Sequence, residues 1–412
     1  MKEMSYLLIT ANVGSLFELW DSIAKAWFDT ISASVSRLSP NFLAFHFQEV
    51  GGKDPKISMK QIEVFSKIML QLPALHMYKL AIGHLDTDCD DKKKYTALGS
   101  FYFIDQSLEH RISIWDFNEE RYLPLKERRM SLSSDFCDER FKKVKFPPEL
   151  SPEKCWCRKG FLHTKWRIDE IPFNFVNIHM FHDTSNLVAL ESSPSVYADC
   201  RQRALKYTLD YIDDFEAAPT FIFGDFNFRT DVKSAVQDLT KSLRPKSIPD
   251  NHDHRVSFSD DLDRNVLLVG KKEFQHKDHE TVFTTEPKWL LKHDAELRPF
   301  KDWLYELEVN FPPSYPCQEE SDVVRYLPTR CPAWCDRVLM NRKARELLSG
   351  DFRYNMIGKK TSMGDHKPVY LNFVQRIWKR SPSTEEEDEA SPIMDCIPQR
   401  TVLVNHNCLC IN

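Results

Sequence analysis

Residues 220–229, TFIFGDFNFR, are the stretch of this 412-residue chain that most constrains its fold. The first four residues are mostly apolar and favour β structure, which predicts a buried strand. A glycine interrupts the run, and Asp225, Asn227 and Arg229 follow at every second position. Because alternate side chains of an extended segment share one face, these three groups are expected to leave the strand end together. Such a set can polarise and orient a water molecule and neutralise anionic oxygens, although a polar turn has the same pattern.

Other predicted strands also end in polar residues. The apolar runs 6–10 and 42–47 predict short buried strands that end close to Asn12 and Glu49. Between them, apolar residues at helical spacing predict a helix over 15–38. This strand–helix–strand order indicates an α/β or α+β sandwich with polar groups gathered along one edge. Further strands are expected at 96–104, 160–168, 173–180, 338–340 and 369–374, and further helices at 62–72 and 192–213.

Three segments follow neither pattern. Residues 231–301 are polar, and we expect helices and loops there without an assignable order. The prolines of 311–316, FPPSYP, forbid a continuing helix and predict an ordered loop. After residue 376, an acidic run at 385–389 lies among Ser, Pro and Thr with few apolar residues. Such a segment cannot offset its own ordering entropy, so a flexible tail is expected.

Charge and cysteine content narrow the class of protein. The net charge is −5, and 42% of the residues are hydrophobic, which is ordinary for a soluble globular protein. A chain that grips nucleic acid through its phosphates needs a broad basic surface, so no nucleic-acid partner is expected. The 11 cysteines follow no disulfide spacing, no secretory signal is visible, and no run is long enough to cross a bilayer. We therefore expect reduced thiols and a cytoplasmic protein.

The polar residues near the strand ends form a set of candidate metal ligands. The set is Asn12, Glu49, Asn177, His179, Asp225, Asn227, Asp336, Asp365 and His366. Carboxylate and amide oxygens without clustered thiolates suit a hard cation such as Mg2+ rather than zinc. The sequence holds no GxxxxGK loop, which excludes a P-loop nucleotide hydrolase, and it holds no GxSxG nucleophile elbow.

Six segments, in this order along the chain, resemble those of inositol polyphosphate 5-phosphatases: TANVG, FQE, FVNIHM, GDFNFR, PAWCDRVL and MGDHKPV. GDFNFR together with PAWCDR is far more specific than the motifs of the wider exonuclease–endonuclease–phosphatase superfamily. The resemblance covers about residues 6–375, and the FPPSYP loop is similar to that of type I members. It implies an α/β (α+β) fold, a four-layer α-β-β-α sandwich with two packed mixed sheets. It also implies a catalytic domain over 1–377, followed by the flexible acidic tail over 378–412.

The resemblance implies a role for each residue around the metal and the attacking water. Glu49, with Asn12 beside it, would hold Mg2+, and Asp365 would lie close to the metal. Asp225 would orient and deprotonate the water, and Asn227 would fix the water and the phosphoryl group.

Further roles concern the phosphate groups. Asp336 would hold His366 in one tautomer, and His366 would stabilise the phosphoryl oxygens in the transition state. His179 would contact the scissile phosphate from the other side. The residues expected to bind substrate are Arg158, Lys159, Asn177, Arg201, Arg229 and Arg330.

The expected substrates follow from one residue of the FPPSYP loop that differs from family members acting on lipids. Many members that act on phosphoinositide lipids have Lys after the Tyr of this loop, whereas this chain has Pro316. This favours soluble inositol polyphosphates, namely inositol 1,4,5-trisphosphate and 1,3,4,5-tetrakisphosphate. Removal of their 5-phosphate would end calcium-mobilising signalling. Lipid 5-phosphatase activity remains an alternative.

The C-terminus departs from the type I pattern. Type I members end in a prenylated CaaX box, but this chain ends in LCIN, so prenylation is not expected. Palmitoylation of Cys408 or Cys410 stays open, and so does peripheral contact with the plasma membrane. We expect a monomer.

Two other functions are alternatives to a phosphatase. A Mg2+-dependent nuclease of the same superfamily would share the GDFN and GDH segments, but it has no reason to carry PAWCDR and should show a long basic face. A catalytically dead inositol-phosphate-binding scaffold would be expected to lack some of the Asp, His and Glu residues that are all present here.

Overall fold

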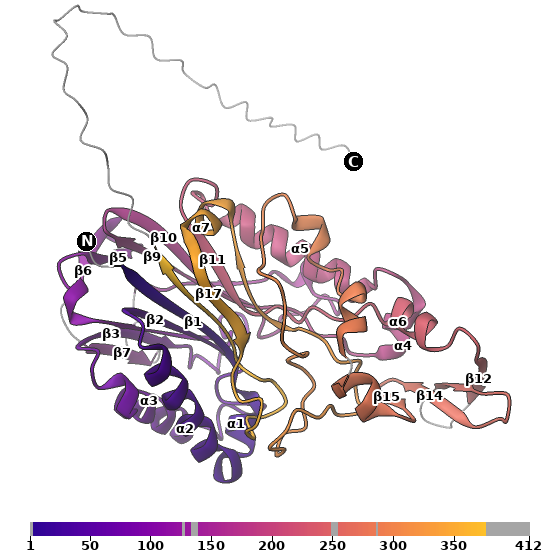
Figure 1. Cartoon of the computed structure of the whole chain (residues 1–412). Coiled ribbons are helices and arrows are strands. Elements are labelled where there is room, and N and C mark those ends of the chain that lie inside the picture. Colours follow the sequence, from indigo (N-terminus) through magenta and orange to yellow (C-terminus); the bar gives the residue numbers. More distant parts are fainter. Residues whose placement is uncertain (1–2, 126–127, 133–138, 249–253, 286, 376–412) are drawn as a thin grey trace, which may run out of the picture. The chain divides into compact units, whose positions relative to one another are not determined.

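The computed structural model describes residues 3–125, 128–132, 139–248, 254–285 and 287–375. The described residues belong to one compact unit, Met1–Arg376 (Figure 1). The predicted tail, 378–412, lies outside the described residues, together with Cys408 and Cys410. Within the described ranges, no helix combines the length and the apolar composition that a membrane crossing requires.

Two mixed seven-stranded sheets form the centre of the fold. The first has the order β17-β18-β1-β2-β4-β3-β7, and the second has the order β16-β11-β10-β9-β5-β6, with β8 paired to β9. The strands of the first sheet are β1 (Met4–Asn12), β2 (Phe42–Gln48), β3 (Leu80–Leu85), β4 (Gly99–Ile104), β7 (Arg128–Leu132), β17 (Leu348–Met356) and β18 (Val369–Gln375). Those of the second are β5 (Ile112–Asp116), β6 (Arg121–Pro124), β8 (Lys142–Lys145), β9 (Gly160–Ile168), β10 (Ile171–His179), β11 (Thr220–Asp225) and β16 (Asp336–Met340).

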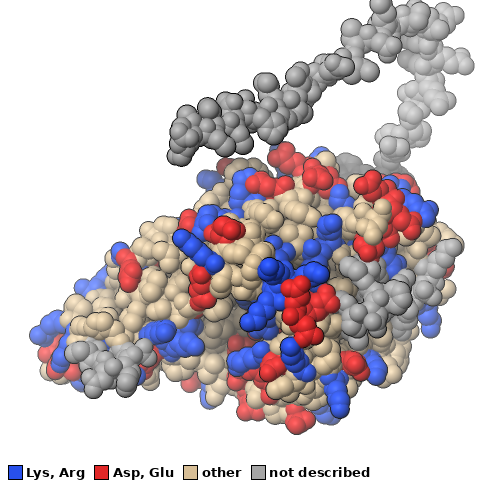
Figure 2. Space-filling model, turned by 180° about the vertical axis from the view of Figure 1, so that it is seen from behind, with Lys and Arg blue, Asp and Glu red and all other residues tan. Residues whose placement is uncertain are grey.

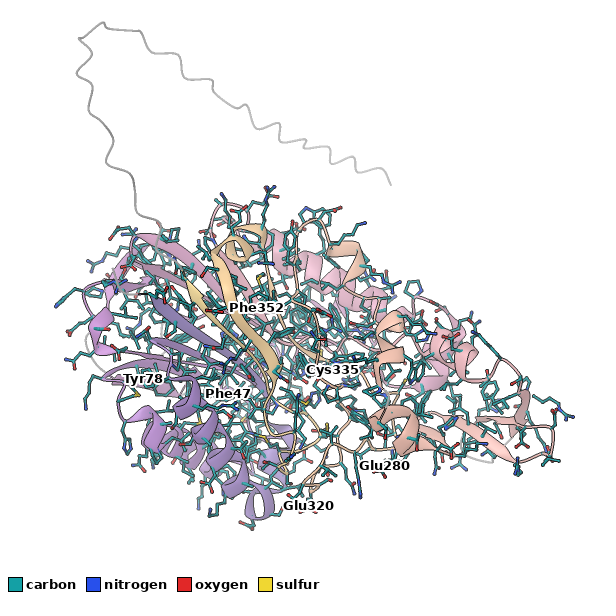
Figure 3. All side chains as sticks on the ribbon, viewed as in Figure 1. Phe47, Tyr78, Glu280, Glu320, Cys335 and Phe352 are labelled. Carbon is teal, nitrogen blue, oxygen red and sulfur yellow. The ribbon has the colours of Figure 1, made fainter. Side chains whose placement is uncertain are left out.

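Helices cover the outer faces of the two sheets. In Figure 1, α2 (Trp20–Leu38) and α3 (Met59–Gln71) lie against the first sheet, and α5 (Val196–Tyr211) lies against the second. Three apolar clusters fill the interfaces, one between the sheets and one under each helical layer. Phe47, labelled in Figure 3, belongs to the cluster under α2 and α3. The expected four-layer sandwich is therefore confirmed. The remaining helices are α1 (Gly14–Glu18), α4 (Asn186–Glu191), α6 (Val232–Leu239) and α7 (Arg342–Leu347).

The predicted helices exist with shifted ends. The helix expected over 15–38 is two helices, α1 and α2, because the backbone leaves the helical conformation at Leu19. The helix expected over 192–213 starts later, where the Ser195 side chain accepts a hydrogen bond from the Ala198 N–H and caps α5. The predicted strand at 160–168 has the same bounds as β9.

A third sheet occupies the region where helices and loops were expected. In the described part of 231–301, α6 and three short 3-10 or π-helical segments of three to seven residues accompany four antiparallel strands: β12 (Arg244–Ile248), β13 (Arg255–Ser259), β14 (Asn265–Gly270) and β15 (Glu273–His276). These strands have four to six residues and include polar sequences such as RPKSI and EFQH. Their apolar runs are too short to show a period of two, so the prediction of a helix-and-loop region was wrong.

Strand register brings the polar strand ends to one edge of the sandwich. In the second sheet, Asp225 is the register partner of His179 on parallel β10 and of Asp336 on antiparallel β16. In the first sheet, Asn12 is level with Gln48, the residue before Glu49. Both sheets therefore present their functional residues at the same edge, where the carboxyl ends of β1, β2, β10 and β11 meet.

We predict that Gly224→Ala strongly destabilises the fold. A methyl group at this position would overlap the Ile178 carbonyl on β10, and the backbone of a central strand cannot move away. We expect a loss of at least about 2 kcal/mol in the free energy of unfolding by urea titration. Gly270→Ala is the matched control, since its methyl would meet only flexible side chains, at 3.3 Å or more. Equal stability of the two variants would contradict this account.

We predict acid sensitivity from His46, which is fully buried between the sheets. Its ring stacks on Phe223 with 3.5 Å between centroids, and burial lowers its pKa to about 3. The unfolded chain binds this proton from about pH 6.5 downwards, so stability is present above that pH and falls towards pH 3, by up to about 1.4 kcal/mol per pH unit. Denaturation midpoints measured from pH 7 to pH 4 should show this slope.

His46→Gln should remove that part of the slope, because glutamine does not titrate. Substitution of the exposed His76 by Gln is the control and should leave the slope unchanged. Parallel pH profiles for the wild type and His46→Gln would show that another group causes the acid sensitivity.

Candidate active site

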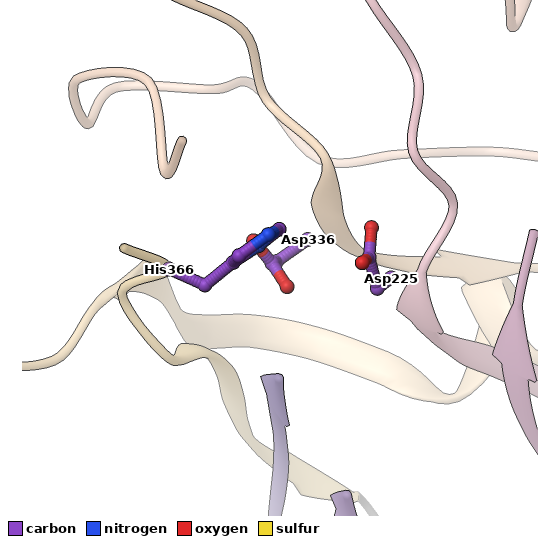
Figure 4. A group of neighbouring side chains, drawn as sticks. All are labelled: Asp225, Asp336 and His366. Atoms are coloured by element: carbon purple, nitrogen blue, oxygen red, sulfur yellow. The ribbon is translucent and has the colours of Figure 1, made fainter. Parts of the chain in front are cut away.

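Asp225, Asp336 and His366 form a buried cluster at the shared edge of the two sheets (Figure 4). Asp225 ends β11, Asp336 begins β16, and His366 lies in the loop before β18 of the other sheet. One ligand atom from each residue lies within 4.8 Å of those of the other two. Within the part of the chain that the structure describes, no other group of His, Cys, Asp and Glu side chains has this arrangement. The cluster can hold a cation or bind a phosphoryl group.

The Asp336 carboxylate orients His366. Its Oδ2 lies 2.9 Å from His366 Nδ1 and also accepts a hydrogen bond of 2.7 Å from Ser314 Oγ. Burial lowers the pKa of His366, but the charges of Asp336 and Asp225 outweigh it and raise this pKa to about 10. The imidazolium form of His366 is therefore favoured at neutral pH, and its side chain lines the cavity described below.

Asp225 is an ionised acceptor held by two amides. Its Oδ2 accepts hydrogen bonds from Asn12 Nδ2 at 3.0 Å and Asn227 Nδ2 at 3.1 Å. Its Oδ1 accepts the Asn227 backbone N–H at 2.8 Å. Burial raises the pKa of Asp225, but His366, His179 and Lys159 outweigh it and hold this pKa well below its usual range. Since a carboxylate oxygen has two lone pairs, Oδ1 retains one for a water molecule.

Asn227 and Arg229 lie at the same site as Asp225, but a turn places them there and not the extended strand that was predicted. The strand ends at Asp225, and Asn227 has a left-handed backbone with φ 51°, so simple alternation does not continue. The turn nevertheless directs the Asn227 amide back to Asp225. Arg229 donates to Asn227 Oδ1, and its guanidinium lies over the Tyr315 ring, 4.3 Å from the centroid. Its Nε and Nη1 have no hydrogen-bond partner among the described residues.

Glu49 and Asn12 provide oxygen ligands on the side of the first sheet. Glu49 has φ 56°, and its Oε1 lies 3.5 Å from His179 Nε2 and 3.7 Å from Lys159 Nζ. Burial raises the pKa of Glu49, but Lys159 and other nearby cations outweigh it and lower this pKa to about 2. A methyl group at Gly14 would lie 2.8 Å from Glu49 Oε2 and 3.3 Å from Asn12 Oδ1. The two oxygens therefore converge above a residue that has no side chain, which fits a small hard cation.

Asp365 lies near this oxygen pair, on the loop that also carries His366. Its Oδ1 accepts a hydrogen bond of 2.7 Å from Ser15 Oγ. Ser15 Oγ also lies 3.1 Å from Glu319 Oε1. These carboxylates make the Glu49 side of the site acidic.

A cavity of about 680 Å³ joins these groups. The predicted residues that line it are Asn12, Glu49, Asp225, Asn227, Arg229, Arg330, Asp365 and His366. Sequence reasoning missed several other lining residues, notably Ser15, Tyr315, Glu319, Lys271 and Lys272. Tyr315 belongs to the FPPSYP loop and was within reach of the resemblance, whereas the two lysines follow no motif.

Three predicted residues lie behind the cavity wall. Lys159 donates to His179 Nε2, and His179 lies 3.4 Å from Asp225 Oδ2. Arg158 donates to the Gly52 carbonyl at 2.6 Å, in the turn that follows Glu49. None of the three lines the cavity. Lys159 and His179 therefore contact Glu49, His179 also contacts Asp225, and Arg158 holds the turn after Glu49. Their predicted contacts with phosphate stay predictions.

Two predicted substrate-binding residues are structural, and the prediction is corrected. The Asn177 amide donates to Phe47 and Gly99 carbonyls of the first sheet, at 3.1 and 2.7 Å, so it ties the two sheets together. Arg201 has no exposed surface. Its guanidinium donates to Asp183 at 2.5 Å and to Glu296 at 2.6 and 2.8 Å. A guanidinium buried between two carboxylates is already neutralised and cannot reach a ring phosphate in the cavity.

Known proteins resemble the chain over most of its length. Residues 150–372 match the family model Endonuclease/Exonuclease/phosphatase family 2. Inositol polyphosphate-5-phosphatase A of Homo sapiens is 42% identical over 381 residues, covering 89% of this chain and 92% of the relative. A Caenorhabditis elegans relative, a probable type I inositol 1,4,5-trisphosphate 5-phosphatase, is 33% identical over 411 residues, covering 90% of this chain and 99% of that protein.

A solved structure shares the fold. It is the inositol polyphosphate 5-phosphatase domain of spSynaptojanin in complex with inositol (1,4)-bisphosphate and a calcium ion. The TM-score is 0.54 at 13% identity, and the match covers 91% of this chain and 84% of the other. The fold, the cluster at the sheet edge and the extent of the identity to the curated relatives lead to one conclusion. The chain belongs to the inositol polyphosphate 5-phosphatase family and is a phosphoric monoester hydrolase.

Proposed function

We propose that this enzyme removes the 5-phosphate from soluble inositol polyphosphates, inositol 1,4,5-trisphosphate and 1,3,4,5-tetrakisphosphate, with Mg2+ as its cation. The observation that carries the proposal is the division of the cavity into two sides. Lys53 and Asp183 also line the cavity, but they are paired with Glu18 and Arg201 respectively. Of the other lining residues, an acidic side contains Glu49, Asp365 and Glu319, and a basic side contains Arg229, Arg330, Lys271 and Lys272. None of these four cations forms an ion pair with a described carboxylate. A cation-assisted reaction on a small polyanion needs both sides.

The attacking water is assigned to Asp225. The remaining lone pair of Oδ1 accepts a hydrogen bond from the water and takes its proton as the new P–O bond forms. The low pKa of Asp225 keeps this carboxylate ionised before substrate enters. Asn12 and Asn227 hold the carboxylate in place through the hydrogen bonds to Oδ2, so little reorganisation accompanies the reaction.

His366 and Arg229 neutralise the phosphoryl oxygens. The imidazolium of His366 carries its charge because Asp336 lies 2.9 Å away. Arg229 is buried, and its unpartnered Nε and Nη1 belong to a side chain that lines the cavity. The Tyr315 ring packs between them, 4.5 Å from the His366 ring and 4.3 Å from the Arg229 guanidinium. Two preorganised cations therefore face the developing negative charge.

Glu49 and Asn12 would hold Mg2+, with Asp365 near it. These residues fit a Mg2+ ion because the Glu49 and Asn12 oxygens converge above Gly14. In addition, the Glu49 carboxylate accepts no hydrogen bond from the described residues. When bound, the cation supplies Lewis acidity to the leaving alkoxide oxygen. Lys159 and His179 keep Glu49 ionised and directed towards this position.

The choice of soluble substrates rests on charge and on the FPPSYP loop. Pro316 stands where many lipid-specific relatives have a lysine. On the face shown in Figure 2, Lys and Arg side chains are interspersed with Asp and Glu.

A phosphate-release assay over soluble inositol phosphates and phosphoinositide vesicles tests the proposal. Release from vesicles alone would reassign the substrate to the lipid headgroup, and release from neither would end the proposal.

We predict that Asp225→Asn lowers kcat by at least about a thousandfold, because the amide cannot accept the proton of the water. The control is Asp214→Asn, near the opposite end of the same strands, where Asp214 accepts a hydrogen bond of 3.0 Å from Asn174. The control should keep its kcat within a few-fold of wild type. Both variants should remain folded by circular dichroism. A folded Asp225→Asn variant with wild-type turnover would disprove the assignment.

We predict that a chelator abolishes activity and that Mg2+ restores it. Mg2+ should also raise the melting temperature of the wild type, since a ligand that binds only the folded state stabilises it. In Glu49→Gln this thermal shift should disappear and the Mg2+ concentration for half-maximal activity should rise at least about tenfold. Glu63→Gln, an exposed position on α3, is the control. A full thermal shift in Glu49→Gln would exclude Glu49 as a ligand.

A further inference from the structure

The turn between β14 and β15 brings two lysines to the cavity from outside the sandwich. Lys271 and Lys272 connect these strands, and both line the cavity while remaining exposed to solvent. They belong to the third sheet, which Figure 1 shows beside the sandwich. The catalytic residues lie instead at the strand ends of the two sandwich sheets and in the loops that adjoin these ends. The turn is therefore a separate element that contributes only to the basic side of the cavity.

The turn is fixed in place by the buried residue Asn186. The Asn186 backbone N–H donates to the Lys271 carbonyl at 3.0 Å. Its amide shares its hydrogens among the carbonyls of Gly270, Glu273 and Thr329, at 3.2, 3.0 and 3.0 Å. Asn186 itself is 2% exposed. These bonds to residues 270, 271 and 273 fix the backbone of the turn that carries both lysines.

Arg330 joins the turn to the loop that precedes β16. Its Nη1 donates to the Lys271 carbonyl at 3.0 Å, and its Nη2 donates to the Asp183 carbonyl at 3.3 Å. The Phe274 N–H adds a bond of 2.8 Å to the Pro328 carbonyl. These are bonds to carbonyls, so they leave the charge of Arg330 uncompensated, and neither lysine has an ion pair with a described carboxylate.

We infer that Lys271 and Lys272 bind a phosphate group of the substrate other than the scissile one, and that they determine preference for multiply phosphorylated inositol rings. The inference rests on the proposed function. An ammonium group on a long, exposed side chain can follow a phosphate as a point charge. Such a contact forms equally in the ground and transition states, so it changes KM and leaves kcat unaltered.

The test compares the double variant Lys271→Gln/Lys272→Gln with the wild type. For inositol 1,4,5-trisphosphate we expect KM to rise about tenfold with kcat within twofold. For inositol 5-monophosphate, which has only the scissile group, KM should not change. Lys271→Arg/Lys272→Arg keeps both charges and should restore most of the lost affinity. Unchanged KM for the trisphosphate, or an equal rise for the monophosphate, would overturn the inference.

Two controls separate a local contact from a loss of net charge and from a failure of the proposed function. Lys277→Gln/Lys288→Gln removes two exposed charges from the same region outside the cavity and should leave KM unchanged. Calorimetric binding of inositol 1,4,5-trisphosphate to Asp225→Asn, with and without the lysine changes, needs no turnover. If the wild type releases no phosphate, the proposed function fails. The binding data then still decide the role of the lysines, and identical dissociation constants would count against it.

Discussion

One hydrogen bond joins the ends of strands that belong to different sheets. Asn12 closes β1 of the first sheet, and its amide donates to Asp225 at the end of β11 in the second. This bond is possible only because the two sheets pack with these strand ends at the same edge. The apolar cluster between the sheets and the Asn177 amide, which binds first-sheet carbonyls, hold that alignment. The relative position of Asn12 and Asp225 is thus set by the sheet packing, while His366 and Asn227 are added by the loop before β18 and the turn after β11.

Much of this arrangement was accessible from the sequence. The apolar runs predicted β1, β2, β11 and β18, since buried strands in the centre of a sheet need continuous apolar residues. Polar residues next to such runs, after them for Asn12, Glu49 and Asp225 and before one for His366, were identified in this way, and all four line one cavity. The reasoning behind Asp225, Asn227 and Arg229 was only partly correct. The three side chains do meet, but a left-handed turn at Asn227 brings them together, and alternation along a strand does not.

The remaining features depend on contacts that no local pattern contains. Arg201 lies on an amphipathic helix, and its sequence neighbours do not reveal that Asp183 and Glu296 surround its guanidinium. The third sheet was missed because its strands are short and partly polar. Lys271 and Lys272 could not be placed before that sheet was known, since only its anchoring through Asn186 brings their turn to the cavity. Long-range packing, rather than propensity, determines these positions.

The left-handed backbone at Glu49 has a consequence for the thermal stability of the enzyme. A glutamate with φ 56° is strained, and glycine or asparagine would adopt this conformation more readily. The residue best suited to hold a cation is therefore not the one best suited to the backbone. Selection for heat tolerance alone, without a requirement for turnover, would favour replacement at this position. Engineering of a more thermostable variant should therefore keep Glu49 and introduce stabilising substitutions on the outer helices.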